Sequence, residues 1–160
     1  MRAAIQIARD AGRKVAFTLS DVFCISRHGD DFRALIAEGL VDILFANENE
    51  LLALAQLEDF DAAVEKVAAQ VPTLVVTRSE NGAIAVQNGT RVAVAAEPIE
   101  KVVDTTGAGD LFAAGFLHGQ AQGWDVEKSL KLGAACAAEI ISHYGARPEA
   151  DLKEVAAKFG

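Results

Sequence analysis

The sequence predicts an α/β fold: a mainly parallel sheet with helices on both faces and one antiparallel hairpin. Three observations predict it. Short β-rich runs alternate with longer helical patterns, and the connections between them are short, which is typical of parallel strands joined by helices. The dipeptide Asn88-Gly89 separates two strand-like runs and favours a two-residue hairpin turn.

The predicted elements follow one another along the whole chain, with no linker, repeat or low-complexity tract, so residues 1–160 are expected to form a single domain. Gly12 is expected to close the first helix. Helices are predicted over residues 2–12, 30–38, 48–55, 60–70, 109–122, 125–143 and 149–159. Strands are predicted over residues 14–20, 42–46, 73–77, 83–87 and 91–95, with a further strand-like run at 101–103.

Composition excludes several classes of function. Hydrophobic residues make up 51% of the chain and charged residues 24%, and the net charge is −8, which argues against a nucleic-acid or membrane-surface role. No apolar run approaches the roughly 20 residues of a membrane span. The N-terminus lacks the apolar core of a signal peptide, and the two cysteines are expected to be reduced, so a cytoplasmic location is expected.

The run Asp104–Asp110, Asp-Thr-Thr-Gly-Ala-Gly-Asp, is the most informative motif. It places a glycine-rich turn before a helix, where unpaired N–H groups and the positive end of the helix dipole favour a phosphate. Asp110 sets a carboxylate beside that anion site and could act as a base. The alternative is an ordinary helix start, since Thr and Asp are good N-caps.

This run resembles the signature of the ribokinase-like (PfkB-type) carbohydrate and nucleoside kinases. The resemblance implies that Asp110 accepts the proton of the acceptor hydroxyl while the N–H groups of Gly107, Ala108 and Gly109 hold the charge on the transferring phosphoryl group. It also implies that Thr105 and Thr106 contact the nucleotide. ATP and Mg²⁺ are the cofactors that the family uses.

A second motif, Asn47-Glu48-Asn49-Glu50, follows a buried strand pattern and resembles the Asn-x-x-Glu element of the same family. Asn47 and Glu50 face the same way in the first turn of a helix and could hold the water shell of a magnesium ion. The alternative is a helix cap, with Asn47 as N-cap and Glu50 reaching back to it.

A third segment, Val75–Gly82, resembles the Val-Thr-x-Gly-x-x-Gly stretch that lies along the nucleotide, which implies contacts from Thr77, Ser79 and Gly82. It departs from the family pattern because Ser79 stands where a glycine is usual.

The resemblance places adenine between the segment that follows this turn and a later helix. Small residues on that helix, including Ala135 and Cys136, would leave a slot for the ring or would instead serve close packing.

Some members of the family hold a monovalent cation such as K⁺ near the matching turn, which implies a role for Asp104 and Thr106. Asp104 is equally well explained as a turn residue. Glu149 departs from the small polar residue often found later in the neighbouring loop.

The resemblance covers the chain but only the later half of the family, so the N-terminal strands and the lid are expected to be absent. The expected function is ATP- and Mg-dependent phosphoryl transfer to a hydroxyl of a small-molecule sugar or nucleoside, which the chain alone would not complete. The alternative is a non-catalytic remnant that binds nucleotide or packs against a partner. A homodimer or a separate N-terminal half is the expected partner, because missing strands leave a sheet edge exposed.

The subgroup is indicated only by Thr18-Leu19-Ser20-Asp21. This sequence looks closer to the adenosine-kinase-like branch than to the sugar kinases, which carry an Asp-x-Asn type sequence at the matching strand end. The alternative is that these residues simply end a strand and turn the chain. The acceptor itself stays open.

Overall fold

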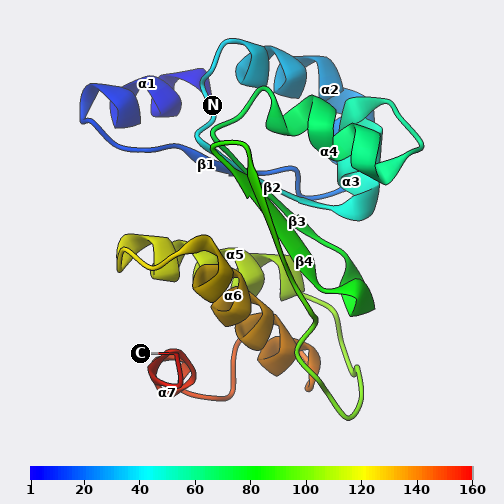
Figure 1. The fold of residues 1–160 in the computed structure, drawn as a ribbon, viewed down its shortest axis with the longest axis vertical. Helices are drawn as coiled ribbons and strands as arrows, with labels where there is room; N and C mark the ends of the chain where they lie inside the picture. Colours follow the sequence, from blue (N-terminus) through cyan, green and yellow to red (C-terminus); the bar gives the residue numbers. More distant parts are fainter. Residues whose placement is uncertain (160) are drawn as a thin grey trace. The chain divides into compact units, whose positions relative to one another are not determined.

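The computed structural model describes residues 1–159 and has the expected α/β fold (Figure 1). Five strands form one mixed, mostly parallel sheet in the order β1-β2-β3-β4-β5. The chain divides into two compact units. The first contains residues 1–76 and 86–91, and the second contains residues 77–85 and the chain from Val92 onward.

The first unit begins with helix α1 (Arg2–Asp10), strand β1 (Ala16–Thr18), helix α2 (Val22–Ala37) and strand β2 (Ile43–Asn47). As expected, Gly12 follows α1 with a positive φ of 65°. Strands β1 and β2 are parallel, with Ala16 opposite Ile43 and Thr18 opposite Phe45. Along β2, Ile43, Leu44, Phe45 and Ala46 are all buried, as expected of a central strand.

Helix α2 is longer than the helix predicted near residues 30–38. It begins at Val22 because Asp21 acts as N-cap and accepts a hydrogen bond from the N–H group of Phe23. The backbone of His28 is non-helical, with φ −129° and ψ 16°, so the helix is kinked there. The kink and the glycine that follows it obscured the helical pattern of residues 22–28.

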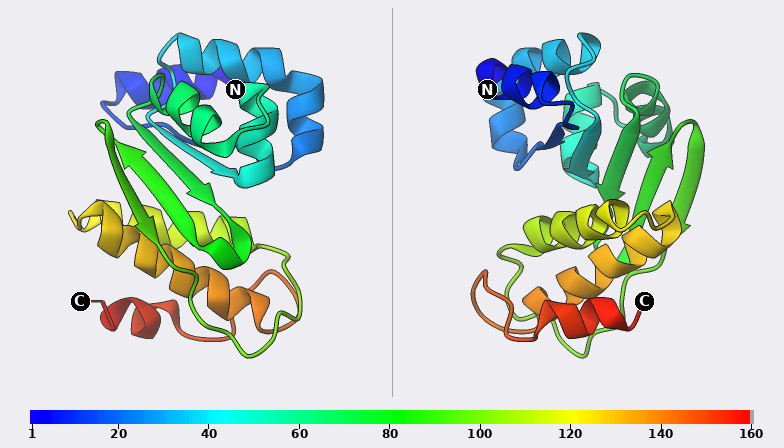
Figure 2. Two further views of the ribbon diagram at one scale, coloured as in Figure 1. Left: turned by 45° about the vertical axis from the view of Figure 1, so that its right-hand side comes forward. Right: turned by 90° about the vertical axis from the view of Figure 1, so that its left-hand side faces the viewer.

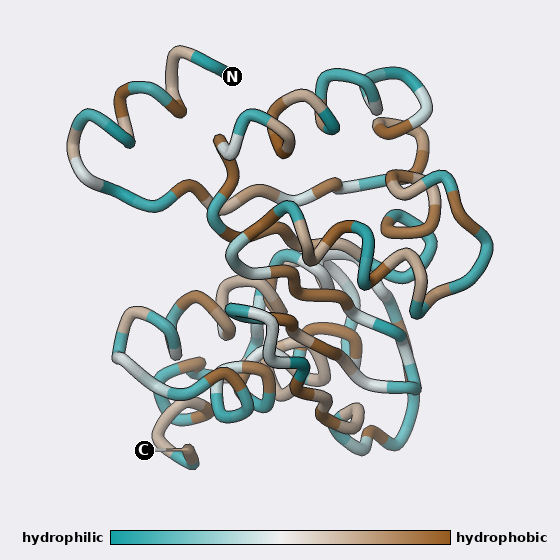
Figure 3. The backbone as a smooth tube through the Cα atoms, turned by 45° about the horizontal axis from the view of Figure 1, so that its top comes forward, coloured by the Kyte–Doolittle hydropathy of each residue, from teal (hydrophilic) through white to brown (hydrophobic). Residues whose placement is uncertain are grey.

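The first unit continues with helices α3 (Glu48–Ala55) and α4 (Phe60–Ala68) and strand β3 (Thr73–Thr77). These bounds agree with the predicted ones to within two residues. Figure 3 shows hydrophobic stretches along the strands, and the β3 residues Leu74, Val75 and Val76 are completely buried. Burial of such side chains contributes about 1.5–3 kcal/mol each.

Strands β4 (Ala83–Gln87) and β5 (Thr90–Val94) form the predicted hairpin. Its two turn residues, Asn88 and Gly89, both have positive φ, 51° and 79°. This conformation matches the twist of two antiparallel strands, and Asn and Gly are the residues that adopt it most readily.

The second unit is built on helices α5 (Ala108–Ala121) and α6 (Val126–Ile141), which lie side by side in both views of Figure 2. Glycines allow this close approach. A Cβ atom on Gly115 would lie 2.9 Å from the Cα of Gly133, and one on Gly119 would lie 2.6 Å from Oγ of Ser129. Helix α7 (Leu152–Ala157) packs on α6.

The strand-like run Lys101–Val103 is irregular, so this part of the prediction is wrong. The N–H group of Val103 donates instead to the carbonyl of Ile141, the last residue of α6, at 2.8 Å. A helix C-terminus leaves its last carbonyls without helical partners, and here the segment supplies one. Among residues 1–159, no helix has the length and apolar character needed to cross a membrane.

Candidate functional site

The turn that begins at Asp104 is closed by its own carboxylate. Oδ1 of Asp104 accepts hydrogen bonds from the N–H group of Thr106 at 2.9 Å and from the Thr106 hydroxyl at 2.7 Å, while Oδ2 accepts from the N–H group of Gly145 at 3.0 Å. The Thr106 hydroxyl, followed by the two N–H groups, lowers the pKa of Asp104 below its usual value. Asp104 therefore acts as a turn residue that also fixes the loop after α6.

Gly107 is the N-cap of α5 and has a φ of 83°, in the region that favours glycine. A Cβ atom there would lie 3.2 Å from the Cβ of Ala146, so the turn rests against the loop after α6. Gly109 has nothing within 4 Å of the position a Cβ would take. The backbone at Gly109 is thus open to a close approach by another group.

The first turn of α5 has no side-chain cap. The N–H group of Ala108 donates to the carbonyl of Thr105 at 3.2 Å. The structure gives the N–H groups of Gly109 and Asp110 no acceptor among residues 1–159. Free N–H groups at a helix start, together with the helix dipole, are suited to an anion such as a phosphate.

Asp110 occupies the third position of α5, next to these N–H groups, and is exposed. Within the described part of the chain its carboxylate has no hydrogen-bond or ion-pair partner. A carboxylate that no neighbouring group occupies can accept a proton from a bound hydroxyl.

Asn47 and Glu50 form a complete capping box at the start of α3. Oδ1 of Asn47 accepts from the Glu50 N–H group at 2.9 Å, and Oε2 of Glu50 accepts from the Asn47 N–H group at 2.9 Å. The Asn47 amide also donates to Oε1 of Glu50 at 2.7 Å. The capping alternative is therefore present in the structure.

Glu50 is only 5% exposed, and this burial raises the pKa of its carboxyl group. The negative charge of Asp21 acts in the same direction. A cation nearby would offset both effects. No group of three or more His, Cys, Asp or Glu side chains able to hold a metal ion directly occurs among residues 1–159.

The segment after β3 turns through a short 3₁₀ helix (Ser79–Asn81). Ser79 has a φ of 50°, so it adopts the conformation for which the family pattern has a glycine. The N–H group of Arg78 donates to the carbonyl of Gly82 at 2.7 Å. A Cβ atom on Gly82 would lie 2.0 Å from the carbonyl oxygen of Val94, so this glycine is required by close backbone contact.

The small residues of α6 are divided between two environments. Cys136 is 3% exposed, and its Sγ lies 3.0 Å from the position that a Cβ on Gly115 would take, so it packs against α5. Burial raises the pKa of its thiol. Ala135 is only partly buried. The packing alternative thus accounts for Cys136.

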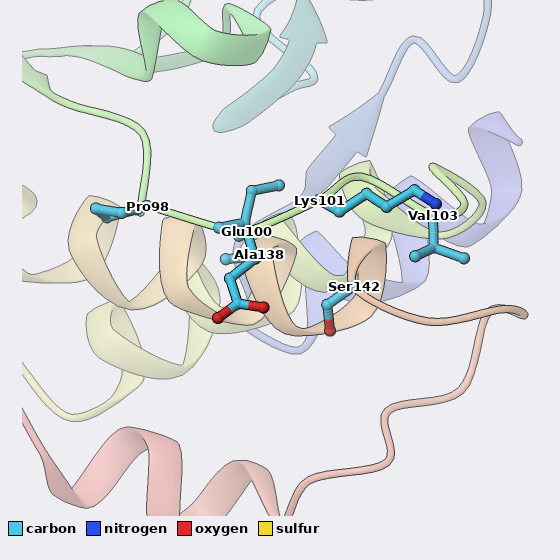
Figure 4. Close-up of a pocket in the computed structure, with 7 residues that line it drawn as sticks. Pro98, Glu100, Lys101, Val103, Ala138 and Ser142 are labelled. Atoms are coloured by element: carbon cyan, nitrogen blue, oxygen red, sulfur yellow. The ribbon is translucent and has the colours of Figure 1, made fainter.

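A hollow of about 410 Å³ lies against α6 (Figure 4). The segment from Pro98 to Val103 runs along the helix, and Ala138 and Ser142 face it. A volume of this size is within the range of small-molecule pockets. The resemblance places the base next to this helix, whereas the strand expected at Lys101–Val103 left no room for the hollow.

The structure brings together several residues of the second unit that lie far apart in the sequence. The Asp104–Gly109 turn contacts Gly145 and Ala146, and two further residues, Glu139 and His143, hold that loop. Neither was predicted as a site residue. Asn47 and Glu50 belong to the first unit.

An open helix start with an unpaired carboxylate beside it, in a mostly parallel α/β fold, agrees with the resemblance to the ribokinase-like class. The profile of the pfkB family of carbohydrate kinases matches residues 1–152. The chain belongs to this family.

Individual relatives agree. The chain is 39% identical to cytidine kinase of Thermococcus kodakarensis over 108 residues, which are 66% of this chain and 38% of that protein. It is 34% identical to adenosine kinase of Dictyostelium discoideum over 121 residues, which cover 66% of this chain and 35% of that protein. The chain therefore spans less than half of the length of these relatives.

Solved structures show the same fold. The crystal structure of adenosine kinase from Sinorhizobium meliloti superposes with a TM-score of 0.96 and 46% identity, over 99% of this chain and 49% of that one. A probable sugar kinase from Rhizobium etli gives a TM-score of 0.93 and 45% identity, over 96% and 47%. A putative ribokinase II from E. coli, solved with ATP and Mg²⁺, gives a TM-score of 0.85 at 24% identity, over 99% and 52%.

Proposed function

We propose that this chain forms the nucleotide-binding part of an ATP- and Mg²⁺-dependent kinase that phosphorylates a hydroxyl group of a sugar or nucleoside. One observation carries the proposal: the two N–H groups without an acceptor at Gly109 and Asp110 lie at the start of α5, beside the unpaired Asp110 carboxylate. Family membership supports the reaction class, because relatives of this chain are sugar and nucleoside kinases.

The residues of the turn have different proposed roles. The N–H groups of Gly107, Gly109 and Asp110 hold the negative charge of the transferring phosphoryl group, and the absence of a side chain at Gly109 lets that group approach. The Ala108 N–H group, which donates to Thr105, acts indirectly by keeping the turn closed. Thr105 and Thr106 are the proposed nucleotide contacts on the other side of the turn.

Asp110 is the proposed base. When ATP is bound with Mg²⁺, it supplies the phosphoryl group and the charge neutralisation that its transfer requires. The Asp110 carboxylate accepts the proton of the acceptor hydroxyl, so that the hydroxyl oxygen can form the new bond to phosphorus. The exposed position of Asp110 leaves room for an acceptor beside it.

Asn47 and Glu50 are proposed to act on magnesium through water. The buried Glu50 carboxylate with its raised pKa, and the charge of Asp21 near it, favour a positive ion at this place. Magnesium usually keeps several waters and few protein ligands, which agrees with a carboxylate whose two oxygens already accept hydrogen bonds from Asn47.

The base of the nucleotide is proposed to lie against α6, where Ala135 and the hollow next to Ala138 offer space for a flat ring. The turn residues Thr77, Ser79 and Gly82 are proposed to follow the nucleotide.

A nucleoside as acceptor is supported by the 46% identity to an adenosine kinase and by the Thr18–Asp21 sequence. The sugar alternative is supported by the 45% identity to a probable sugar kinase.

A monovalent cation such as K⁺ remains a prediction for the Asp104–Thr106 turn. Oδ1 of Asp104 accepts two hydrogen bonds and Oδ2 accepts one, so Oδ2 keeps a lone pair that could face the ion. Exchange of potassium for sodium tests it: a nucleotide affinity that does not respond to the exchange removes the cation from the proposal.

The decisive experiment uses the 160-residue chain and two variants of the same turn. Calorimetric titration with ADP and Mg²⁺ should give weak but measurable binding, which Gly109→Ala abolishes by placing a methyl group where the phosphate approaches. Asp110→Asn should leave binding largely unchanged. Phosphoryl transfer is then assayed with a panel of sugars and nucleosides, and Asp110→Asn should remove whatever transfer the unmodified chain shows.

Each outcome separates one part of the proposal. Absence of nucleotide binding would contradict it and favour a remnant that only packs against a partner. Binding without any transfer supports the nucleotide site and assigns the acceptor site to another polypeptide segment. Transfer that survives Asp110→Asn would refute the assignment of the base.

A further inference from the structure

Glu139 lies in the last turn of α6, where a carboxylate is electrostatically unfavourable. The negative end of the helix dipole is located there, and the last turn contains no basic residue. The side chain is also only 12% exposed. A charged group in such a position lowers stability unless specific contacts compensate for it.

The compensating contacts come from the two ends of the loop that follows the helix. Oε1 of Glu139 accepts hydrogen bonds from the N–H groups of Glu149 at 2.7 Å and Ala150 at 2.8 Å, and it lies 3.2 Å from Nε2 of His143. His143 is at the start of the loop and the two N–H groups are at its end. Glu139 therefore closes the loop 142–150 on itself.

The same loop carries the two residues that contact the phosphate-binding turn. The N–H group of Gly145 donates to Oδ2 of Asp104, and Ala146 packs against the backbone of Gly107. A continuous set of contacts thus runs from Glu139, through the middle of the loop, to the start of α5. All of these residues belong to the second unit.

We propose that Glu139 is a positioning residue: by holding both ends of the 142–150 loop, it fixes Gly145 and Ala146 against Asp104 and Gly107 and so sets the shape of the phosphate-binding turn. A carboxylate suits this task better than a neutral acceptor, because hydrogen bonds to a charged oxygen are roughly twice as strong. The second oxygen, Oε2, is buried without a partner among residues 1–159, so the contacts of Oε1 carry the whole interaction.

The consequence for nucleotide binding rests on the proposed function, whereas the effect on the turn does not. The test therefore has two independent readouts on the 160-residue chain. The first is the amide NMR spectrum with hydrogen exchange, which follows Gly107, Gly145 and Ala150 without any ligand. The second is the affinity for ADP.

In Glu139→Ala we expect the amide resonances of Gly107 and Gly145 to shift, and exchange at Gly145 and Ala150 to accelerate by about tenfold or more. The amide of Leu132, in the middle of α6, should exchange as before. Affinity for ADP should fall about tenfold. Glu139→Gln should restore slow exchange at Ala150 in part, because its amide oxygen can still accept hydrogen bonds from the loop.

Glu127 provides the matched control. It lies in the first turn of the same helix and pairs with Lys131 at the surface, so Glu127→Ala should change none of these readouts. Equal acceleration at Leu132 in Glu139→Ala would mean a general loss of stability and would overturn the proposal. Faster exchange at Ala150 with unchanged Gly107 and Gly145 would overturn it too, since the loop would then not be coupled to the turn.

The two proposals fail in different ways. A chain that does not bind ADP but shows the expected shifts at Gly107 refutes the proposed function and supports the positioning role. A chain that binds ADP, but whose Gly107 and Gly145 amides do not respond to Glu139→Ala, refutes the positioning role and leaves the function standing.

Discussion

The two motifs that resemble those of the pfkB family are built in opposite ways. The Asn47–Glu50 element is closed within four residues, each side chain capping the backbone of the other. The Asp104–Gly109 turn is held from a distance, since the N–H group that binds Oδ2 of Asp104 belongs to Gly145. The first is a local structure that a short peptide could form, whereas the second exists only when α5 and α6 are packed.

The two motifs also differ in whether their polar groups have hydrogen-bond partners within the protein. In the capping box both carboxylate oxygens of Glu50 and the side-chain oxygen of Asn47 accept hydrogen bonds. At the start of α5, by contrast, the N–H groups of Gly109 and Asp110 have no acceptor among residues 1–159. Open groups are costly unless water or a ligand meets them, so we expect the ligand at the second motif and an indirect role for the first.

The largest effect is expected from breaking the support of the distant turn. Gly115→Ala places a Cβ atom 2.9 Å from the Cα of Gly133, and the resulting overpacking should reduce the free energy of unfolding by about 1–3 kcal/mol. Chemical denaturation measures it. Gly109→Ala is the matched control on the same helix, because nothing lies within 4 Å of the new methyl group, and its stability should be unchanged or slightly higher.

A smaller effect is expected at the local motif. Asn47→Ala removes the N-cap and one half of the capping box, which should cost about 1 kcal/mol. The loss should be confined to α3, so that hydrogen exchange accelerates there and not in α5 or α6. If α5 were affected to the same extent, the view of the box as a self-contained structure would be wrong.

Glu50→Gln tests whether the same motif binds magnesium in addition to capping α3. Burial raises the pKa of Glu50, so its contribution to stability is present below the ordinary carboxyl pKa and is lost as the pH rises through the raised value. The glutamine variant should lack this pH dependence and should need more magnesium for nucleotide binding. A changed stability with an unchanged magnesium requirement would leave only the capping role.

Asp104→Asn should show the opposite pH behaviour at the distant turn. The pKa of Asp104 is lowered, so its contribution is present above the ordinary carboxyl pKa and is lost as the pH falls through the lowered value. The melting temperature of the variant should be lower than that of the unmodified chain near neutral pH, and the difference should shrink in acid. A constant difference would mean that the charge of Asp104 does not matter.

The smallest expected effect concerns His143. Burial alone would lower its pKa, but the carbonyl of Tyr144 and the carboxylates of Glu139 and Glu149 together raise it above the ordinary value. The stabilisation from protonated His143 should be complete below the ordinary histidine pKa and should disappear as the pH rises through the raised one. Thermal melts of His143→Gln between these limits should show a smaller dependence on pH than the unmodified chain.

The sequence predicted best those features that neighbouring residues decide. The hairpin at Asn88-Gly89 and the box at Asn47–Glu50 were predictable because backbone conformation and hydrogen-bond reach depend on residues two to three apart. The helix at residues 22–28 was missed because a kink at His28 interrupts its pattern. The capping signal of Asp21 was available and could have located its start.

The site itself was predicted only in part. Resemblance singled out the residues from Asp104 to Asp110, and composition could not show what holds them. The strand predicted at residues 101–103 does not form. The N–H group of Val103 donates instead to the carbonyl of Ile141 at the end of α6, which lies 38 residues later in the sequence. At Ser79, by contrast, the residue departs from the family pattern, yet its backbone adopts the positive-φ conformation for which that pattern has a glycine.

The sequence by itself determined the class of fold, the family and the two motifs, because these depend on local patterns that a linear chain carries. Only the tertiary structure decided that Gly145, Ala146 and Glu139 support the turn, that Cys136 faces α5, and that a hollow lies beside Ala138. These contacts join residues far apart in the chain. They form only when helix packing has brought their backbones within hydrogen-bonding or van der Waals distance, which no local pattern encodes.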